Sequence, residues 1–224
     1  MPASITLSRL SWSTPDGRRL FSDIELSFGP ERVGLVGRNG VGKTTLFKLI
    51  SGELPPASGS VTTSGTFAVL AQAALQSSAE TVADLFDAGP ALALLARAES
   101  GDATAAEIAE ADWTLEGRLA AALAGFGLDT PTTTALAALS GGQRTRVGLA
   151  ALLFAEPDFL LLDEPTNNLD RDGRNAVIDM LATWRAGAIV ISHDRELLET
   201  MDVIVELSAL GAARYGGNWS HYRE

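Results

Sequence analysis

The segment Gly37-Arg38-Asn39-Gly40-Val41-Gly42-Lys43-Thr44 decides the fold of this chain. It lies between a short apolar run, residues 33–36, and a helical pattern, residues 44–51. Its glycines let backbone N–H groups point inward around phosphate groups, and the start of the helix adds positive potential. In this pattern the lysine reaches the β- and γ-phosphates, and the threonine hydroxyl can ligate Mg²⁺. The segment therefore predicts a phosphate loop, the name used below for residues 37–44.

Two carboxylates form a second motif at the end of another apolar run. Residues 159–162 are all apolar, which suits a strand buried on both faces, and Asp163 and Glu164 follow directly. Ligands bind at the carboxyl ends of strands in open parallel sheets, so both side chains are expected beside the phosphate loop. Asp163 suits Mg²⁺, and Glu164 suits polarising an attacking water.

The rest of the chain alternates between strand-like and helical patterns around these motifs. Strand-like runs dominate the first 72 residues, a helical pattern rich in Ala, Leu and Glu fills residues 81–128, and alternation resumes after residue 140. Residues 203–207 are predicted as the last strand. Strands that alternate with helices indicate an α/β fold with a mostly parallel sheet covered on both faces.

Ser140-Gly141-Gly142-Gln143 marks the start of a helix that runs to about residue 154. Ser140 with Gln143 three residues later is the pattern of a capping box. A glycine-rich helix start also exposes several N–H donors to an anion, which indicates a second phosphate site. Both interpretations can hold together.

Composition excludes several classes of protein. The chain has 224 residues, 46% of them hydrophobic and 20% charged, with no cysteine and a net charge of −11. The absence of cysteine excludes a disulfide scaffold, a Cys-ligated zinc site and a thiol nucleophile. The net negative charge makes the chain a poor general binder of nucleic acid. No apolar run approaches the ~18 residues needed to span a bilayer, and the N-terminus lacks a signal pattern. A soluble, cytoplasmic protein without membrane insertion is expected.

The order of the motifs resembles that of ATP-binding cassette (ABC) ATPases. The phosphate loop, Gln72, the signature at residues 139–143, residues 160–164, Leu169-Asp170 and Ser192-His193 follow one another as in that family. The resemblance implies a phosphate-loop (P-loop) NTPase fold, an ABC nucleotide-binding domain with a mostly parallel core sheet, an N-terminal antiparallel β part and a helical subdomain. Residues 1–224 would form one such domain. Its RecA-like core with the β part would comprise residues 1–78 and 156–224, and its helical and signature subdomain residues 79–155.

The resemblance also implies roles for individual residues, with ATP and Mg²⁺ as cofactors. In the family two cassettes pack head to tail, and each ATP lies between the phosphate loop of one and the signature of the other. Catalytic roles are implied for Lys43, Gln72, Glu164 and His193, and Mg²⁺ ligation for Thr44, Gln72 and Asp163. Nucleotide contacts are implied for Gly37, Arg38, Asn39, Gly40, Val41, Gly42, Lys43, Thr44 and Thr45 of one cassette and for Ser140, Gly141, Gly142 and Gln143 of the other.

The contact with adenine is left open between two alternatives. In the family adenine usually stacks on an aromatic side chain of the first hairpin, and the corresponding position holds Thr14 here. Trp12 lies two residues away, on the same face of an extended strand. Trp12 either stacks on the base or packs in the sheet.

Two further stretches resemble the ABC-F subfamily, which has tandem cassettes without membrane domains and many members that act on ribosomes. They are EPTNNLD at residues 164–170 and RYGGNWSHY at residues 214–222, with Asp112-Trp113 and Leu115-Glu116 in the helical part. Asn168 departs from the pattern, because His is commoner there. The resemblance implies a fragment of a tandem-cassette ATPase whose partner is a second cassette, or a second copy with ATP. The ribosome or its RNA would be met through segments outside this chain.

Two other functions compete with that interpretation. The chain has the length of an ATP-binding subunit of an ABC membrane transporter. A final helix of about two turns after Asn218 argues instead for the start of a linker helix, because isolated helices this short are marginal. Chromosome-organising ATPases need a long coiled coil between phosphate loop and signature, and that interval holds no sustained heptads.

Overall fold

The computed structural model describes residues 3–70 and 80–224 of the chain. Its contacts divide the chain into two compact units. The first unit comprises Met1–Ala71, Pro157–Asn167 and Val177–Glu224, and the second comprises Gln72–Glu156 and Asn168–Ala176.

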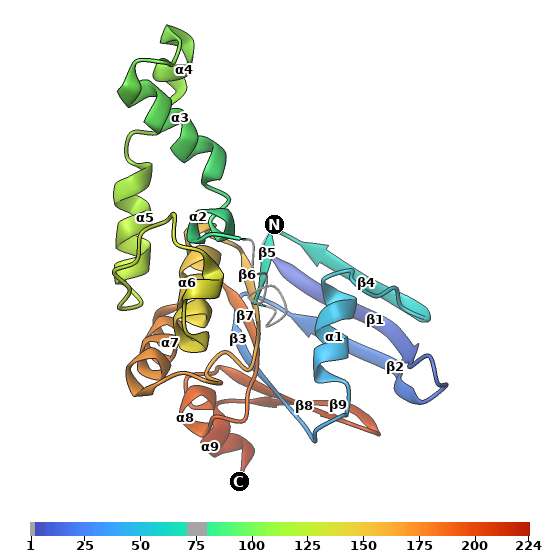
Figure 1. Cartoon of the computed structure of the whole chain (residues 1–224). Helices are drawn as coiled ribbons and strands as arrows, with labels where there is room; N and C mark the ends of the chain where they lie inside the picture. The colour runs from blue at the N-terminus through green and yellow to red at the C-terminus, as the bar shows by residue number, and fades with distance from the viewer. Residues whose placement is uncertain (1–2, 71–79) are drawn as a thin grey trace. The chain divides into compact units, whose positions relative to one another are not determined.

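A six-stranded sheet in the order β5-β6-β7-β3-β8-β9 forms the centre of the first unit (Figure 1). The first five strands run parallel, and β9 runs antiparallel to β8. The strands β3, β6 and β7 are buried almost throughout, as expected for short apolar runs with both faces covered. The bounds are β3 Arg32–Val36, β5 Phe67–Leu70, β6 Phe159–Asp163, β7 Gly187–Ile191, β8 Val203–Ser208 and β9 Gly211–Gly216.

The prediction that residues 203–207 are the last strand is wrong, because β9 follows β8 in a hairpin. The strand β9 has no buried residue and no apolar alternation. Backbone pairing with β8 holds β9 at the edge of the sheet. Hydrophobic periodicity in the sequence therefore does not predict this strand.

A separate three-stranded antiparallel sheet, β2-β1-β4, forms the N-terminal part of the first unit. The strand β1 pairs Ile5 with Phe28 and Leu7 with Leu26, and these side chains enter one core with α1 and the larger sheet. A turn at residues 15–17 joins β1 to β2. Figure 1 shows α1 beside this sheet. The bounds are β1 Ser4–Ser13, β2 Arg19–Phe28, β4 Ser58–Ser64 and α1 Lys43–Ile50.

The second unit is helical. Its core includes an edge-to-face contact between Phe86 and Phe154, with ring centroids 5.4 Å apart, and the guanidinium of Arg118 lies 5.0 Å from the centroid of the Phe154 ring. In Figure 1 α3 and α4 lie at one end of this unit and α6 at the other. The bounds are α2 Val82–Leu85, α3 Gly89–Ser100, α4 Ala105–Glu110, α5 Leu115–Ala124, the 3₁₀ helix η2 Leu136–Ala138 and α6 Gly141–Phe154.

Three further helices follow the motif-bearing strands: α7 Arg171–Thr183, α8 Arg195–Leu198 and α9 Trp219–Tyr222. The helical pattern in the sequence is clearest from residue 175 onward, but α7 begins at Arg171. It begins earlier because the Asp170 carboxylate accepts the N–H of Gly173 at 2.8 Å and caps the first turn. Asn218 caps α9 by accepting the N–H of His221, and the helix has four residues, fewer than the two turns predicted. Within the described ranges, no helix combines the length and the apolar character needed to cross a bilayer.

Candidate nucleotide site

The phosphate loop joins the end of β3 to the start of α1, as predicted. Gly37, Gly40 and Gly42 all have positive φ angles, of 149°, 76° and 111°. At Gly37 a Cβ atom would collide with the backbone oxygen of Leu207, and at Gly42 it would lie 2.7 Å from the ring of Phe21. The first and last of these positions therefore admit only glycine, for both backbone and packing reasons.

The side chain of Lys43 is folded back over its own loop. Its Nζ atom donates to the carbonyl oxygens of Gly37 at 2.8 Å and Arg38 at 3.4 Å. Burial lowers the pKa of Lys43, and the negative charges of Glu164 and Asp163 partly oppose that shift. An ammonium group with two carbonyl neighbours in a largely buried site is poised to exchange them for phosphate oxygens.

Thr44 and Asp163 bring the loop and the end of β6 together. The Thr44 hydroxyl donates to Asp163 Oδ2 at 2.7 Å. This contact joins the first turn of α1 to the carboxyl end of a buried strand, where the sequence predicted a carboxylate. A hydroxyl and a carboxylate oxygen are hard oxygen ligands, so the pair fits Mg²⁺, which takes few protein ligands and keeps several waters. No group of three His, Cys, Asp or Glu side chains suited to a metal ion occurs among the described residues.

Glu164 occupies a turn just beyond β6. Its backbone has a φ of 49°, and its N–H donates to the carbonyl of Ile191 in β7 at 2.9 Å. The side chain is 18% exposed, and its Oε1 atom lies 3.5 Å from Nε2 of His193. Burial raises the pKa of Glu164, and this effect exceeds the opposing influence of His193. A carboxylate with a raised pKa is a better proton acceptor than an ordinary exposed one.

His193 follows β7 and also faces the phosphate loop. Its Nε2 atom lies 3.2 Å from Oδ1 of Asn39. The imidazole is 57% exposed, so it is accessible from the cavity beside the loop. The structure thus brings together His193, Glu164 and the middle of the phosphate loop. In the sequence, His193 lies 154 residues and Glu164 125 residues after Asn39 of the loop.

A cavity of about 460 Å³ lies beside the phosphate loop, on the side that faces Glu164 and His193. It is called the loop cavity below. The motif residues Gly40, Gly42, Lys43, Thr44, Thr45, Asp163, Glu164 and His193 line it, with Asn39. Sequence reasoning missed three other lining residues, Leu20, Asn167 and Ile191. Leu20 and Ile191 are apolar residues in strands and carry no motif signal. The guanidinium of Arg18 also contacts the loop, donating to the carbonyl of Gly40 at 3.2 Å.

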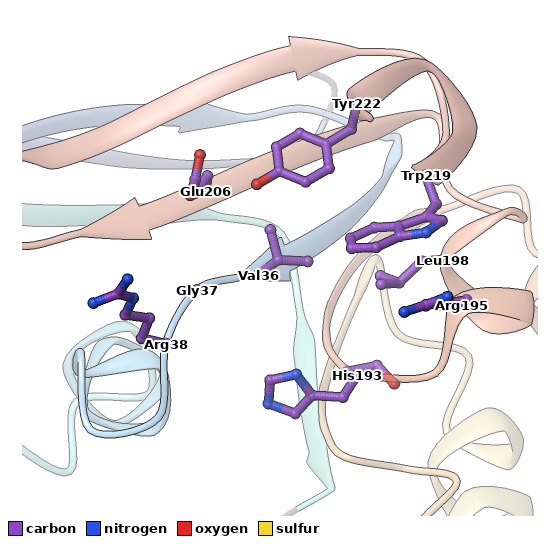
Figure 2. A pocket seen from close by; sticks show the side chains of 10 residues that line it. Val36, Gly37, Arg38, His193, Arg195, Leu198, Glu206, Trp219 and Tyr222 are labelled. Carbon is purple, nitrogen blue, oxygen red and sulfur yellow. The ribbon is translucent and has the colours of Figure 1, made fainter. Parts of the chain in front are cut away.

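A second cavity, of about 370 Å³, opens on another side of the loop (Figure 2). Gly37, Arg38 and His193 line it together with Trp219 and Tyr222 of the last helix. Figure 2 shows the Trp219 indole close to Leu198 and Arg195, with the Tyr222 hydroxyl directed toward Glu206. The last helix of the chain therefore packs close to the segment that carries His193.

The signature lies in the second unit, at the start of α6. The capping box is confirmed: Gln143 N–H donates to Ser140 Oγ at 3.2 Å, and Ser140 N–H donates to Gln143 Oε1 at 2.9 Å. The N–H groups of Gly141 and Gly142 remain at the open end of the helix. Close packing surrounds Gly142, because a Cβ atom there would lie 3.2 Å from the carbonyl oxygen of Asn168, whose φ is 63°.

The predicted adenine contact, Trp12, stands apart from the loop cavity. Trp12 is half-buried, pairs with Phe21 across the β1–β2 ladder and packs against the core of the first unit. It is not among the residues that line the loop cavity. Gln72 lies outside the described residues.

Comparison with known proteins identifies the family. The sequence model described as "ABC transporter" matches residues 21–167. The chain belongs to this family. The predicted fold class, an ABC ATPase domain, is confirmed by solved structures, including one titled "Structure of ATP binding subunit of ABC transporter" with a TM-score of 0.74 and 22% identity, covering 95% of this chain and 89% of that one.

Relatives place this ABC cassette near the ABC-F proteins, as the sequence predicted. The ABC transporter F family member 3 of Arabidopsis thaliana is 32% identical over all of this chain and 29% of its own length. The energy-dependent translational throttle protein EttA of Mycobacterium tuberculosis (strain CDC 1551 / Oshkosh) is 32% identical over 92% of this chain and 41% of its own length. The cassette thus spans less than half the length of the curated relatives it matches.

Proposed function

We propose that this cassette binds ATP with Mg²⁺ and hydrolyses it to ADP and phosphate at an interface with a second cassette. The observation that carries the proposal is the 2.7 Å hydrogen bond from Thr44 to Asp163. It places a hydroxyl from the phosphate loop and a carboxylate from a neighbouring strand at one point, with the half-buried Glu164 directly after it. This combination supports nucleotide hydrolysis more specifically than a phosphate loop alone does.

The phosphate loop and Lys43 hold the triphosphate. Backbone N–H groups around Gly40 and Gly42 and the N-terminus of α1 attract the β-phosphate. Lys43 exchanges its two carbonyl acceptors for β- and γ-phosphate oxygens. Thr44 and Asp163 fit Mg²⁺, which would neutralise charge on the phosphates when bound, and Gln72 is proposed as a further ligand.

Glu164 is the proton acceptor in the proposed reaction. A water molecule attacks the γ-phosphorus and transfers a proton to the Glu164 carboxylate, while the bond from the γ-phosphorus to the bridging oxygen breaks and ADP leaves. The raised pKa of Glu164 supports this role, because a stronger base accepts the proton more readily. His193 is proposed to donate a hydrogen bond to the γ-phosphate, and its position beside Glu164 and Asn39 supports this role.

The signature is proposed to act on nucleotide held by a second cassette. The helix start, where Ser140 and Gly141 are exposed and Gly142 is half-buried, offers N–H donors that the capping box does not use. Family membership supports a head-to-tail pair, in which each site takes its phosphate loop from one cassette and its signature from the other. The partner would be a tethered cassette in a longer chain, or a second copy of this one.

The proposed setting is the ribosome in the cytoplasm. The relatives support it: one is named a translational throttle protein and another an F family member of the ABC transporters. A subunit of a membrane transporter is the competing function. Co-sedimentation of the full-length protein with ribosomes, in the presence of a non-hydrolysable ATP analogue, would support the ribosome, and recovery with membranes would contradict it.

Magnesium-dependent hydrolysis tests the proposed activity directly. Phosphate release from ATP is measured under single-turnover conditions with Mg²⁺, with EDTA, and with Asp163→Asn. Hydrolysis that needs Mg²⁺ and falls at least tenfold in Asp163→Asn supports the proposal. Equal rates in all three conditions would contradict it.

A further inference from the structure

His193 lies in a short link between a buried strand and a one-turn helix. The imidazole is 57% exposed and meets Asn39 and Glu164, so its position depends on the backbone on either side of it. On one side, Ser192 is fully buried after β7, and its Oγ accepts the N–H of Asp194 at 3.0 Å. On the other side, Asp194 is the residue that caps the start of α8. The backbone at His193 is therefore fixed by whatever fixes α8.

A helix as short as α8 is not stable on its own. Its four residues form about one turn, far below the ~12 residues at which an isolated helix becomes marginal in water. Part of its support comes from the core, because Leu197 and Leu198 are buried. Leu198 packs against β3, since a Cβ atom at Gly34 would lie 2.7 Å from Leu198 Cδ2. Packing against its neighbours therefore sets the position of α8, and with it that of His193.

The last helix, α9, supplies further support. The Ser220 hydroxyl donates to Glu199 Oε1 at 2.5 Å, and the Ser220 N–H donates to Glu199 Oε2 at 3.4 Å. Because Glu199 is the C-terminal cap residue of α8, these bonds join the end of α8 to the start of α9. Figure 2 shows the Trp219 indole beside Leu198, and Trp219 lines the same cavity as His193. The two one-turn helices thus stabilise each other beside the cavity that His193 lines.

We propose that Trp219 and Glu199 are positioning residues for ATP hydrolysis. They hold α9 on α8, and this contact keeps the link at residues 192–194 in the conformation that presents His193 to the γ-phosphate. The inference rests on the proposed function and extends it to the part of the chain that follows the last motif. Neither residue is among the described residues that line the loop cavity, so both act through His193. Displacement of a catalytic group by about 1 Å can slow a reaction ~10²-fold, so support of this kind affects the rate.

Single-turnover hydrolysis of ATP by the 224-residue chain tests this inference. Trp219→Ala and Glu199→Ala should each lower the rate constant about tenfold, because the imidazole is less well placed. The dissociation constant of ATP should stay within about twofold, since the phosphate loop and Lys43 hold the triphosphate. Trp219→Phe keeps an aromatic ring beside Leu198 and should restore most of the rate. Circular dichroism checks that each variant is folded.

A double-mutant cycle separates positioning of His193 from a general loss of structure. His193→Ala removes the group through which both residues act, so Trp219→Ala added to it should cause no further loss of rate. If Trp219 only stabilised the fold, its loss would slow the His193→Ala variant by the same factor as the wild-type chain. The same cycle with Glu199→Ala is an independent test, and it decides the matter should Trp219→Ala fail to fold.

Trp113→Ala is the matched control. Trp113 is also a tryptophan next to the start of a helix, but it is 55% exposed in the second unit and is not among the residues that line either cavity. This variant should leave both the rate constant and the dissociation constant of ATP unchanged.

The outcomes separate this inference from the proposed function. Losses that multiply in the double variants, or a wild-type rate in both Trp219→Ala and Glu199→Ala, would overturn the inference while Mg²⁺-dependent hydrolysis remained. A wild-type rate in His193→Ala would overturn both the proposed role of His193 and the inference. A chain that does not hydrolyse ATP with Mg²⁺ would overturn the proposed function and the inference with it.

Discussion

Glu164 Oε1 lies 3.5 Å from His193 Nε2, and the same nitrogen lies 3.2 Å from Asn39 Oδ1. Both neighbours of Nε2 are oxygen acceptors, so the tautomer with hydrogen on Nε2 satisfies them. The imidazole therefore connects the end of one strand to the phosphate loop through a single donor. A γ-phosphate at this point would compete for the same hydrogen, which gives His193 a direct means of responding to nucleotide.

Glu164→Gln should retain ATP binding and slow hydrolysis by about 10²–10⁴-fold, the usual effect of losing a general base. The substitution keeps the shape of the side chain and removes its capacity to accept a proton. Single-turnover measurement of phosphate release checks it, with ATP affinity measured on the same sample. An unchanged single-turnover rate would remove Glu164 from the mechanism.

The same substitution should raise the melting temperature by a few degrees at pH 7–8. Burial raises the pKa of Glu164 above its ordinary value of 4.5, so the folded state binds this proton more tightly than the unfolded state does. Stability from this group is therefore present at low pH and is lost as pH rises through the raised pKa. The gain in Glu164→Gln should shrink toward pH 4, and a gain constant across pH 4–8 would contradict the assignment.

Lys43→Ala should weaken ATP binding about 10–100-fold and leave the fold intact, since a charge-assisted hydrogen bond to phosphate has about this strength. The glycines, not the lysine, fix the shape of the loop. Calorimetry gives the affinity, and circular dichroism checks the fold. Wild-type affinity in the variant would exclude the proposed phosphate contact.

Gly42→Ala should destabilise the chain by about 1–3 kcal/mol, because the position combines a φ of 111° with a Cβ that would lie 2.7 Å from the Phe21 ring. Gly117→Ala is the control. Gly117 lies inside α5 with nothing within 4 Å of its Cβ position, so alanine should stabilise there by about 0.5–1 kcal/mol. Urea denaturation measures both, and shifts of the same sign would contradict this explanation of the loop.

Hydrolysis per chain should rise with protein concentration. Lys43, Asp163, Glu164 and His193 all come from one chain, whereas the proposed signature contact needs a second cassette. A tethered partner would supply it at an effective concentration of order mM, and a net charge of −11 opposes pairing of free copies. Light scattering should find a monomer without ATP and a dimer of Glu164→Gln with ATP. A stable dimer in nucleotide-free buffer, or a specific activity that does not change with concentration, would contradict this.

Sequence predicted those parts of the site in which chemistry restricts the residue type. Glycine conformation fixes Gly37 and Gly42, the loop needs its lysine at Lys43, and Asp163 ends an apolar strand. Leu20 was not predicted as a site residue, because the sequence pattern of a strand is the same whether an apolar side chain faces the core or a cavity.

The face of the sheet on which Trp12 lies depends on irregularities in the pairing of β1 with β2. The ladder between β1 and β2 shifts register between Leu7 and Leu10, between Leu10 and Trp12, and again before Ser13. Each shift changes which face a side chain meets, and alternation cannot locate such shifts. The edge strand β9 was missed for a different reason, since backbone pairing leaves no pattern in its side chains.

The folded-back ammonium of Lys43 has a consequence for how quickly the loop can be filled. Its two carbonyl acceptors occupy the ammonium group in the way that the oxygens of a bound anion would. The cation therefore stays close to the position in which it would bind phosphate, and the loop does not have to fold around an arriving ligand. When a nucleotide binds, Lys43 Nζ exchanges carbonyl oxygens for phosphate oxygens, and the loop loses little conformational entropy at that step. Nucleotide capture by such a loop should be governed by encounter and dehydration more than by folding of the backbone.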